Sequence, residues 1–417
     1  MGQIFGDNLI PPELVTEITY VALTFCLFVF PRFLIRFGVP YALTTFTLGF
    51  VFNFSGVIVY EDNVVSLLAT LGIVSLFLFA GLEVDTTHLK KDKRILIQHL
   101  LALSLVLVGS SFLLQETLDL SVRTATLFAL ALLTPSAGFI LDAIDTSRLS
   151  FDTKYWIRSK AIAAELLALI LMFSFIKSSS FSELGVSLLA LVLLFTILPV
   201  LFVFFIKRVA PLAPKSEFGF LLIMALLAGI VTKTLGVYYL IGAFIVGTIA
   251  RRFELIQPEF SSYSMMNSLK FFTNFFTPFY FFHAGARISP ADFSPQAFLI
   301  GGLLLLVFIP LRVYLILFHR HFSLREEWKL SFPVATSLLP NLVFGLVIAD
   351  ILLTRFELPH ALYGALIIYT IGATLLPPVL QHYFWKGEAS EALVEIENSM
   401  GAITFYDKRE PEKDHRL

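Results

Sequence analysis

Long apolar stretches divide this sequence, and their length constrains the fold more than any other feature. A helix needs about 20 predominantly apolar residues to cross the hydrocarbon core of a bilayer, and only helices and closed barrels bond all of their backbone groups there. We count about thirteen such stretches, at residues 14–31, 38–54, 64–82, 95–114, 121–143, 155–177, 184–206, 217–236, 238–253, 267–285, 298–318, 328–352 and 359–384. The sequence therefore predicts an all-α polytopic membrane protein with about 13 transmembrane helices, in the cell membrane (inner or plasma membrane).

The positive charges between these stretches predict the orientation of the chain. Alternate connections are basic, and in membrane proteins the basic loops face the cytoplasm. The basic connections contain Arg32 and Arg36; Lys90 to Arg94; Arg148, Lys154 and Arg158; Lys207, Arg208 and Lys215; Arg251 and Arg252; and Arg320, Arg325 and Lys329. This alternation places the N-terminus outside and the C-terminus inside. Residues 1–385 then form one membrane transporter domain, and residues 386–417 form a short polar cytoplasmic tail.

Composition and motifs exclude several classes of function. Hydrophobic residues make up 57% of the chain and charged residues only 15%, whereas a soluble domain has about 25% charged residues. The formal net charge of -1 gives no bias towards nucleic acid. The single cysteine, Cys26, cannot form an intrachain disulfide or a cysteine-based metal site. Because the chain also lacks a His-Glu-x-x-His pair and a serine-elbow motif, we expect no enzymatic activity and no cofactor.

One acid, Glu165, lies inside the apolar stretch SKAIAAELLALIL, residues 159–171. Counted from the start of the predicted helix 155–177, it lies about 15 Å deep, in the middle of a core about 30 Å thick. Acids at that depth are costly, and they mark ion or proton pathways. We therefore interpret Glu165 as the binding site of a proton or a monovalent cation. The alternative is a protonated side chain that only bonds a neighbouring helix.

Two basic residues lie inside predicted spans. Lys160 is near the inner interface, and its long side chain is expected to snorkel there, so we give it a structural role. Arg312 lies about 10 Å from the inner end of the helix 298–318, and arginine stays protonated. We expect Arg312 to be a fixed positive charge that balances either Glu165 or the C-terminal ends of helices, although it too could snorkel inwards.

Two predicted spans carry a proline near mid-membrane, in the sequences LLTPSAGF and SLLPNLVFG. Pro135 and Pro340 each free a backbone carbonyl, and unwound backbone at that depth is tolerated only where it is buried in protein or lines a cavity. Thr134, Ser136 and Asn341 can offer side-chain oxygens beside these breaks. The alternative is an ordinary proline kink in each helix.

The two interrupted helices occupy corresponding positions in the chain. If helices 1–6 form one repeat and helices 8–13 the second, the fifth helix corresponds to the twelfth and runs in the opposite direction. This is an inverted-topology repeat whose broken helices cross at the midplane, which is how secondary transporters build their sites. The half-helix ends there present partial charges of both signs.

Five stretches, taken in order, resemble a known family: VPYALTTFTLGFVFN, LGIVSLFLFAGLEVD, ALALLTPSAGFIL, LGVYYLIGAFIVGTIARR and FFTPFYFFHAGARIS. They are similar to the patterns of monovalent cation/proton antiporters of the second cation/proton antiporter family, the Kef- and Nap-like sodium or potassium/proton exchangers. The resemblance covers nearly the whole membrane region.

The resemblance implies roles for two residues. The sixth helix of the family bears the ion-binding acid, which matches Glu165, and the eleventh bears a basic residue, which matches Arg312. The family acid is usually Asp preceded by Asp, Asn or Gln, and the pair Ala164–Glu165 departs from that pattern at both positions. Related antiporters with one acid and an arginine tend to be electroneutral. The resemblance further implies a homodimer in which a mobile core moves against a dimerisation domain.

We therefore expect a secondary active transporter that exchanges Na+ or K+ for a proton, electroneutrally, by alternating access at Glu165. Oxygens from the broken helices replace part of the water shell of the cation. The empty carboxylate is charged, and carrying it across an apolar barrier is costly, so only the loaded forms change access. Two alternatives stay open on the same fold: a carrier of organic anions or other solutes, and a channel.

Overall fold

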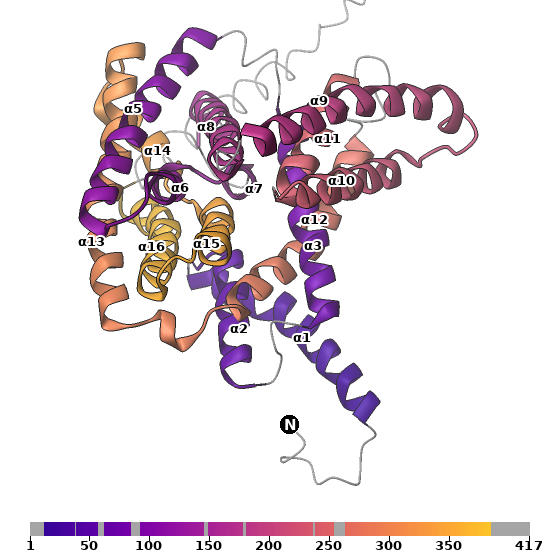
Figure 1. Ribbon diagram of the computed structural model, residues 1–417, viewed down its shortest axis with the longest axis horizontal. Helices are drawn as coiled ribbons and strands as arrows, with labels where there is room; N and C mark the ends of the chain where they lie inside the picture. Colours follow the sequence, from indigo (N-terminus) through magenta and orange to yellow (C-terminus); the bar gives the residue numbers. More distant parts are fainter. Residues whose placement is uncertain are drawn as a thin grey trace, which may run out of the picture.

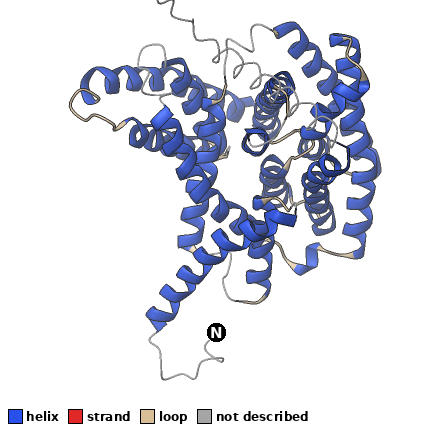
Figure 2. Cartoon of the chain, turned by 180° about the vertical axis from the view of Figure 1, so that it is seen from behind, coloured by secondary structure: helices blue, strands red, loops and turns tan. Residues whose placement is uncertain are grey.

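The computed structural model describes residues 12–37, 39–56, 62–84, 92–145, 149–177, 181–236, 238–253 and 263–384, and these residues are almost entirely helical (Figures 1 and 2). No strand occurs among them. The α-helices are α1 (Pro12–Leu34), α2 (Tyr41–Phe54), α3 (Asn63–Leu82), α5 (Lys93–Leu118), α6 (Val122–Leu133), α7 (Ala137–Asp145), α8 (Phe151–Lys177), α9 (Phe181–Phe204), α10 (Glu217–Thr234), α11 (Tyr239–Phe253), α12 (Tyr263–Ala286), α13 (Pro295–Leu324), α14 (Trp328–Ser337), α15 (Leu342–Phe356) and α16 (His360–Phe384).

Each apolar stretch of the sequence corresponds to one helix or to a pair of helices separated by a short break. Nine helical spans in the described residues are long and apolar enough to cross a membrane, or ten if the bent pair α14 and α15 is one span. The all-α polytopic class is thus confirmed. The total of thirteen spans and the orientation stay predictions, and the predicted tail from residue 386 lies outside the described residues.

Both mid-membrane prolines coincide with breaks. Residues 134–136 separate α6 from α7, and residues 338–341 separate α14 from α15, with the second pair bent by 49°. Neither helix is therefore merely kinked. Proline removes a backbone donor and clashes with the preceding turn, and the polar neighbours of each proline bond the freed backbone groups, as described below.

The helices form two groups, which lie on opposite sides of Figure 1. In the scaffold group, α12 and α11 pack on α3, α12 packs on α2, and α10 packs on α11. In the core group, α13 and α15 pack on α16, α6 packs on α5 and α15, and α8 packs on α5, α6, α7 and α14. Helix α9 packs on α11 and so belongs to the scaffold group. The two groups meet where α7 contacts α3 and where α8 contacts α9. Both broken helices and Glu165 belong to the core group.

Glycines bring the helices of the scaffold group into backbone contact. A Cβ atom on Gly285 of α12 would lie 1.9 Å from the carbonyl oxygen of Phe46 in α2, and one on Gly49 of α2 would lie 1.9 Å from the carbonyl oxygen of Phe282. Small residues at such crossings are typical of helix packing in membranes, because lipid supplies no hydrophobic drive for association and close packing must do so.

Replacing Gly285 with alanine should separate these helices. We expect the unfolding free energy of Gly285→Ala in detergent to fall by about 1–3 kcal/mol, since the backbone oxygen of Phe46 cannot move aside as a side chain would. The matched control is Gly109→Ala in α5, where an added Cβ meets no atom within 4 Å and alanine favours the helix. Equal thermal midpoints for the two variants would contradict this account.

Candidate functional site

Glu165 faces the protein interior. Its side chain is 2% exposed, and its Oε2 accepts a hydrogen bond from the backbone N–H of Ala137 at 3.1 Å. Ala137 is the first residue of α7. The carboxylate therefore sits at the N-terminal end of a half-helix, where unpaired N–H groups and the helix dipole favour negative charge. The side chain does not point towards the acyl chains.

The two breaks touch each other directly. The N–H of Ser136 donates to the carbonyl of Pro340 at 2.9 Å, and the N–H of Phe344 donates to Oγ of Ser136 at 3.0 Å. The side-chain amide of Asn341 donates to the carbonyl of Ala131 at 2.8 Å. Backbone groups that lack a partner within their own interrupted helix therefore form hydrogen bonds with the break of the other helix. These bonds hold the two interrupted helices together at the crossing.

Three side-chain oxygens predicted to serve a cation lie at this crossing. Thr134, Ser136 and Asn341 are all buried. Oδ1 of Asn341 has no hydrogen-bond partner in the described structure, and a buried acceptor without a partner is costly. The structure connects Ser136 to Glu165 through the adjacent residue Ala137. It records no direct bond from Thr134 or Asn341 to the carboxylate.

Arg312 is buried, so it does not snorkel to the membrane surface. Its guanidinium donates to the carbonyl of Leu338 at 2.7 Å and to the hydroxyl of Tyr369 at 3.3 Å. Tyr369 donates in turn to the carbonyl of Leu132. Leu338 is the C-cap residue of α14, where a cation offsets the negative end of the helix dipole. Arg312 was expected to balance either Glu165 or the C-terminal end of a helix. In the structure its guanidinium bonds the C-terminal end of α14, and no bond to Glu165 is recorded among the described residues.

Lys160 was expected to snorkel, and this prediction is wrong. The side chain is completely buried, and Nζ lies 2.8 Å from Nδ1 of His319 in α13. Tertiary packing of α5 and α13 over α8 covers the lysine, and the hydropathy of α8 alone does not show this. The sequence of α13 did contain a signal that this face is buried in protein. His319 follows Arg312 by seven residues, so these two polar side chains lie on the same face of an otherwise apolar helix.

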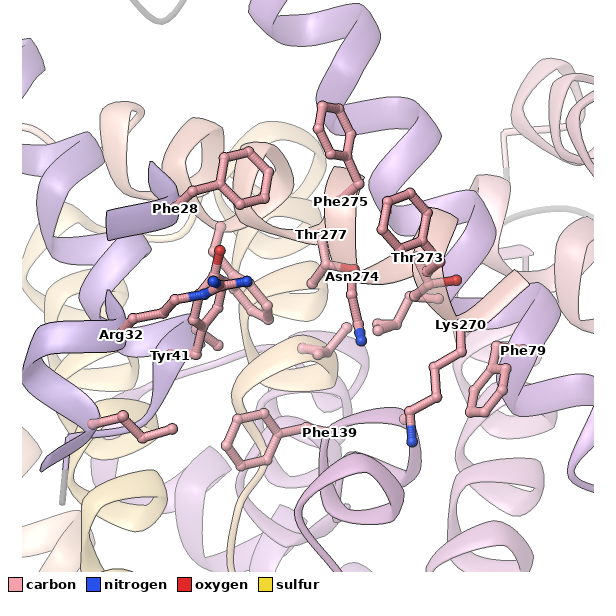
Figure 3. Close-up of a pocket in the computed structure, with 17 residues that line it drawn as sticks. Phe28, Arg32, Tyr41, Phe79, Phe139, Lys270, Thr273, Asn274, Phe275 and Thr277 are labelled. Atoms are coloured by element: carbon pink, nitrogen blue, oxygen red, sulfur yellow. The ribbon is translucent and has the colours of Figure 1, made fainter. Parts of the chain in front are cut away.

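A pocket of about 420 Å³, the Lys270 pocket, lies between the scaffold and core groups on one side of the crossing. Its lining includes the polar side chains of Arg32, Lys270 and Asn274, with Phe139 of α7 on another wall (Figure 3). Gly138, next to the residue that bonds Glu165, also lines it. Glu165 itself does not line this pocket, and the residue that bonds it, Ala137, is the neighbour of Gly138 in α7.

A second pocket of about 330 Å³, the Asp350 pocket, lies on the other side of the crossing. Asp350 of α15 pairs there with Arg287 at 2.5 Å and accepts a hydrogen bond from the hydroxyl of Tyr238. Along α3, Ile73 lines this pocket and Leu76 lines the Lys270 pocket. About one helical turn of apolar side chains therefore separates the two pockets.

Comparisons with known proteins show the family of the chain and a similar fold. The family described as "Sodium/hydrogen exchanger, transmembrane" matches the chain over residues 21–382. The "Probable Na(+)/H(+) antiporter 3" of Methanocaldococcus jannaschii is 27% identical over 268 residues, which cover 62% of this chain and 68% of the relative. Among solved structures, the sodium proton antiporter MjNhaP1 of the same organism superposes with a TM-score of 0.67 at 15% identity, covering 91% of this chain and 98% of that one. A second structure of MjNhaP1, from electron microscopy, superposes with a TM-score of 0.63 at 16% identity, covering 97% of this chain and 100% of that one.

Proposed function

Because the chain belongs to the sodium/hydrogen exchanger family, a family of transporters and not of enzymes, we propose that it exchanges one monovalent cation for one proton at Glu165. Cation/proton exchange across a membrane, with Na+ and H+ as substrates, follows from the family. The role of Glu165, the one-for-one ratio and the use of K+ are our proposals. The observation that carries them is the buried carboxylate at the N-terminal end of α7, beside the crossing of the broken helices.

The same oxygens serve the proton and the cation in turn. A carboxylate binds a proton covalently or a cation electrostatically, and each loaded form of Glu165 is neutral. Ser136, Thr134 and the unpartnered Oδ1 of Asn341 are the oxygens that complete the shell of a dehydrated cation. Pro135 and Pro340 keep the backbone open at this depth, where half-helix ends stabilise both signs of charge.

Access alternates between the two pockets. The Lys270 pocket and the Asp350 pocket approach the crossing from opposite sides, and one apolar layer divides them. Under the positive-inside rule the Lys270 pocket, with Arg32 at its rim, is cytoplasmic. A rocking motion of the core group against the scaffold group moves this layer past Glu165. The charged, empty form does not cross because its transfer through apolar surroundings is costly.

Lipid and a second copy of the chain are the proposed partners outside the site. Apolar side chains of α9 such as Val186, Leu189 and Val200 are largely exposed. In a membrane such a face contacts either acyl chains or another apolar helix. We propose a homodimer in which the scaffold group is the fixed part.

The test is proton movement in sealed vesicles. Purified protein is reconstituted with an acidic interior and a quenched pH-sensitive dye. Chlorides of sodium, potassium, lithium and rubidium are added in turn, and then organic anions as salts of a bulky organic cation. We expect sodium to dequench the dye in a saturable way. A response to organic anions alone would identify a solute carrier instead, and would remove the proposal.

The one-for-one ratio predicts that the membrane potential has no effect on the rate. Each exchange moves no net charge, so a potential of about 100 mV, worth about 2.3 kcal/mol per charge, has nothing to act on. At one fixed potassium gradient, valinomycin changes only the potential, so initial rates of sodium-driven proton flux with and without valinomycin should agree within error. A strong dependence on potential would exclude the ratio, and an uncoupled sodium current would indicate a channel.

A further inference from the structure

The Lys270 pocket has a chemical character that cation exchange does not explain. Two basic side chains, Arg32 and Lys270, line it (Figure 3), and no carboxylate occurs among its described lining residues. Basic side chains repel a cation and attract an anion, so a route that served a cation alone would be lined differently. Six further lining residues are phenylalanines: Phe28, Phe79, Phe139, Phe271, Phe275 and Phe281.

The basic and apolar residues of this pocket lie at different depths. Arg32 belongs to the last turn of α1, and Lys270 lies in the first third of α12. The lining extends along α12 to Phe281, about 16 Å further along the helix axis, and reaches Gly138 and Val343 beside the two breaks. Under the positive-inside assignment the pocket is therefore basic at its cytoplasmic rim and apolar towards the crossing.

The uncharged polar residues of α12 fit the same gradient. Asn274 lies one turn beyond Lys270 and its side chain points into the pocket (Figure 3), where the amide can donate to an anion. Thr273 and Thr277 also line the pocket, but their hydroxyl oxygens have almost no accessible surface. These threonines therefore offer mainly their methyl groups to an occupant, and the accessible donors stay near the rim.

The walls of the pocket belong to both helix groups. Phe275 and Phe281 of α12 are part of the scaffold group, whereas Phe139 of α7 and Val343 of α15 are part of the core group. An occupant touches both groups at once. It fills the space whose shape has to change when the core group rocks against the scaffold group.

Charge and size together select the class of occupant. A basic rim over an apolar interior is complementary to an amphiphile that has one anionic head and one apolar tail. Arginine and lysine are the side chains that bind carboxylates, and phenylalanine walls exclude water from a tail. The volume of about 420 Å³ is that of a site for one small molecule, typically about 300–1,000 Å³. It suits a single acyl chain better than the two chains of a phospholipid.

We propose that the Lys270 pocket binds the anion of a long-chain fatty acid, which enters from the cytoplasmic side. The carboxylate accepts hydrogen bonds from Arg32, Lys270 and Asn274, and the tail lies along the phenylalanines towards the crossing. The bound fatty acid occludes this route to Glu165 and bridges the two helix groups, so it inhibits exchange. The inhibition rests on the proposed function, whereas the binding does not.

The binding test maps where a fatty acid attaches. Full-length protein in nanodiscs of phosphatidylcholine is irradiated with a photoreactive long-chain fatty acid, and labelled residues are identified by mass spectrometry. We expect labels on pocket residues of α1, α7 and α12, reduced at least about tenfold by excess palmitate. Hexadecanol, which has the chain without the charge, should compete little, and labels on the exposed face of α9, at Val186 and Leu189, should respond to neither. Equal competition by the alcohol, or pocket labels that palmitate does not displace, would overturn the site.

Variants test the head group. Replacing both Arg32 and Lys270 with glutamine should lower the palmitate-sensitive labelling at least about tenfold, since hydrogen bonds between charged groups are the strong ones. The matched control is Arg36→Gln, at an exposed position that does not line the pocket, and it should label as the unaltered protein does. Undiminished labelling of the double variant would refute the assignment. If the double variant does not fold, the competition between palmitate and hexadecanol on the unaltered protein decides. Displacement of the label by phosphatidylglycerol but not by palmitate would identify a phospholipid and overturn the fatty acid.

The exchange test uses dodecyl sulfonate, because fatty acids cross bilayers as neutral acids and would themselves collapse the pH gradient. A sulfonate stays anionic. It is added to both sides of reconstituted vesicles as the salt of a bulky organic cation, below the concentration at which empty vesicles leak. We expect sodium-driven proton flux to fall at least about fivefold in the unaltered protein and in Arg36→Gln, and less than about twofold in the double variant, each compared with its own rate without sulfonate.

The two tests fail in different ways. Active protein that the sulfonate does not inhibit, or equal inhibition of the double variant, would refute occlusion of the route. The labelling test involves no transport, so it gives the same result whether or not Glu165 is the exchange site. A failed Glu165 assignment with specific labelling, and a failed fatty acid site with intact exchange, are therefore distinguishable.

Discussion

Glu165→Gln is expected to abolish sodium-driven proton movement while the protein stays folded. The amide has nearly the shape of the carboxyl group, and its oxygen can still accept the hydrogen bond from Ala137. It neither takes up nor releases a proton near neutral pH, and it carries no negative charge. Loss of a charged ligand in a buried site costs about 3 kcal/mol or more, so we expect exchange to fall by on the order of 100-fold or more.

The measurement is dequenching in vesicles, with monodispersity and the thermal midpoint as checks of folding. The control is Glu116→Gln in α5, which makes the same chemical change at an exposed position and should leave exchange unchanged. Glu165→Asp keeps a carboxylate on a shorter stem, so exchange should persist with an altered sodium KM. Exchange by Glu165→Gln at the unaltered rate would remove Glu165 from the mechanism.

Some features were predictable because they depend on local sequence. Hydropathy located the helices within a few residues, because a bilayer demands a fixed apolar length of every span. The breaks at Pro135 and Pro340 followed from the covalent structure of proline. The burial of Glu165 followed from its depth in an apolar helix, since a short acid cannot reach the surface.

Other features depend on contacts between distant segments, and the sequence does not encode these locally. The apolar surroundings of Lys160 predicted snorkelling, but His319, which follows it by 159 residues, covers and bonds it. Arg312 had two candidate partners, the carboxylate of Glu165 and a helix C-terminal end, and only the position of α14 relative to α13 selects Leu338. The layer between the two pockets is likewise a property of the assembled helices.

The second large effect is expected at Arg312. Arg312→Met removes the donors to the carbonyl of Leu338 and to the hydroxyl of Tyr369, and leaves the buried end of α14 without its cap. An unpaired buried carbonyl costs about 1–3 kcal/mol, and α14 leads directly into the second break. We expect exchange per folded molecule to fall at least about tenfold, since a displacement near 1 Å in a positioned site can cost far more.

Arg123→Met separates loss of stability from loss of position. Arg123 also donates to backbone carbonyls, those of Phe175 and Ile176 near the end of α8, away from the crossing. Its removal should lower the thermal midpoint comparably to Arg312→Met, yet leave the exchange rate per folded molecule unchanged. Arg312→Lys keeps the charge but lacks the planar fork that reaches two acceptors, so partial activity is expected. If Arg312→Met exchanged as fast as Arg123→Met per folded molecule, the cap on α14 would matter for stability alone, and the fixed charge would have no part in transport.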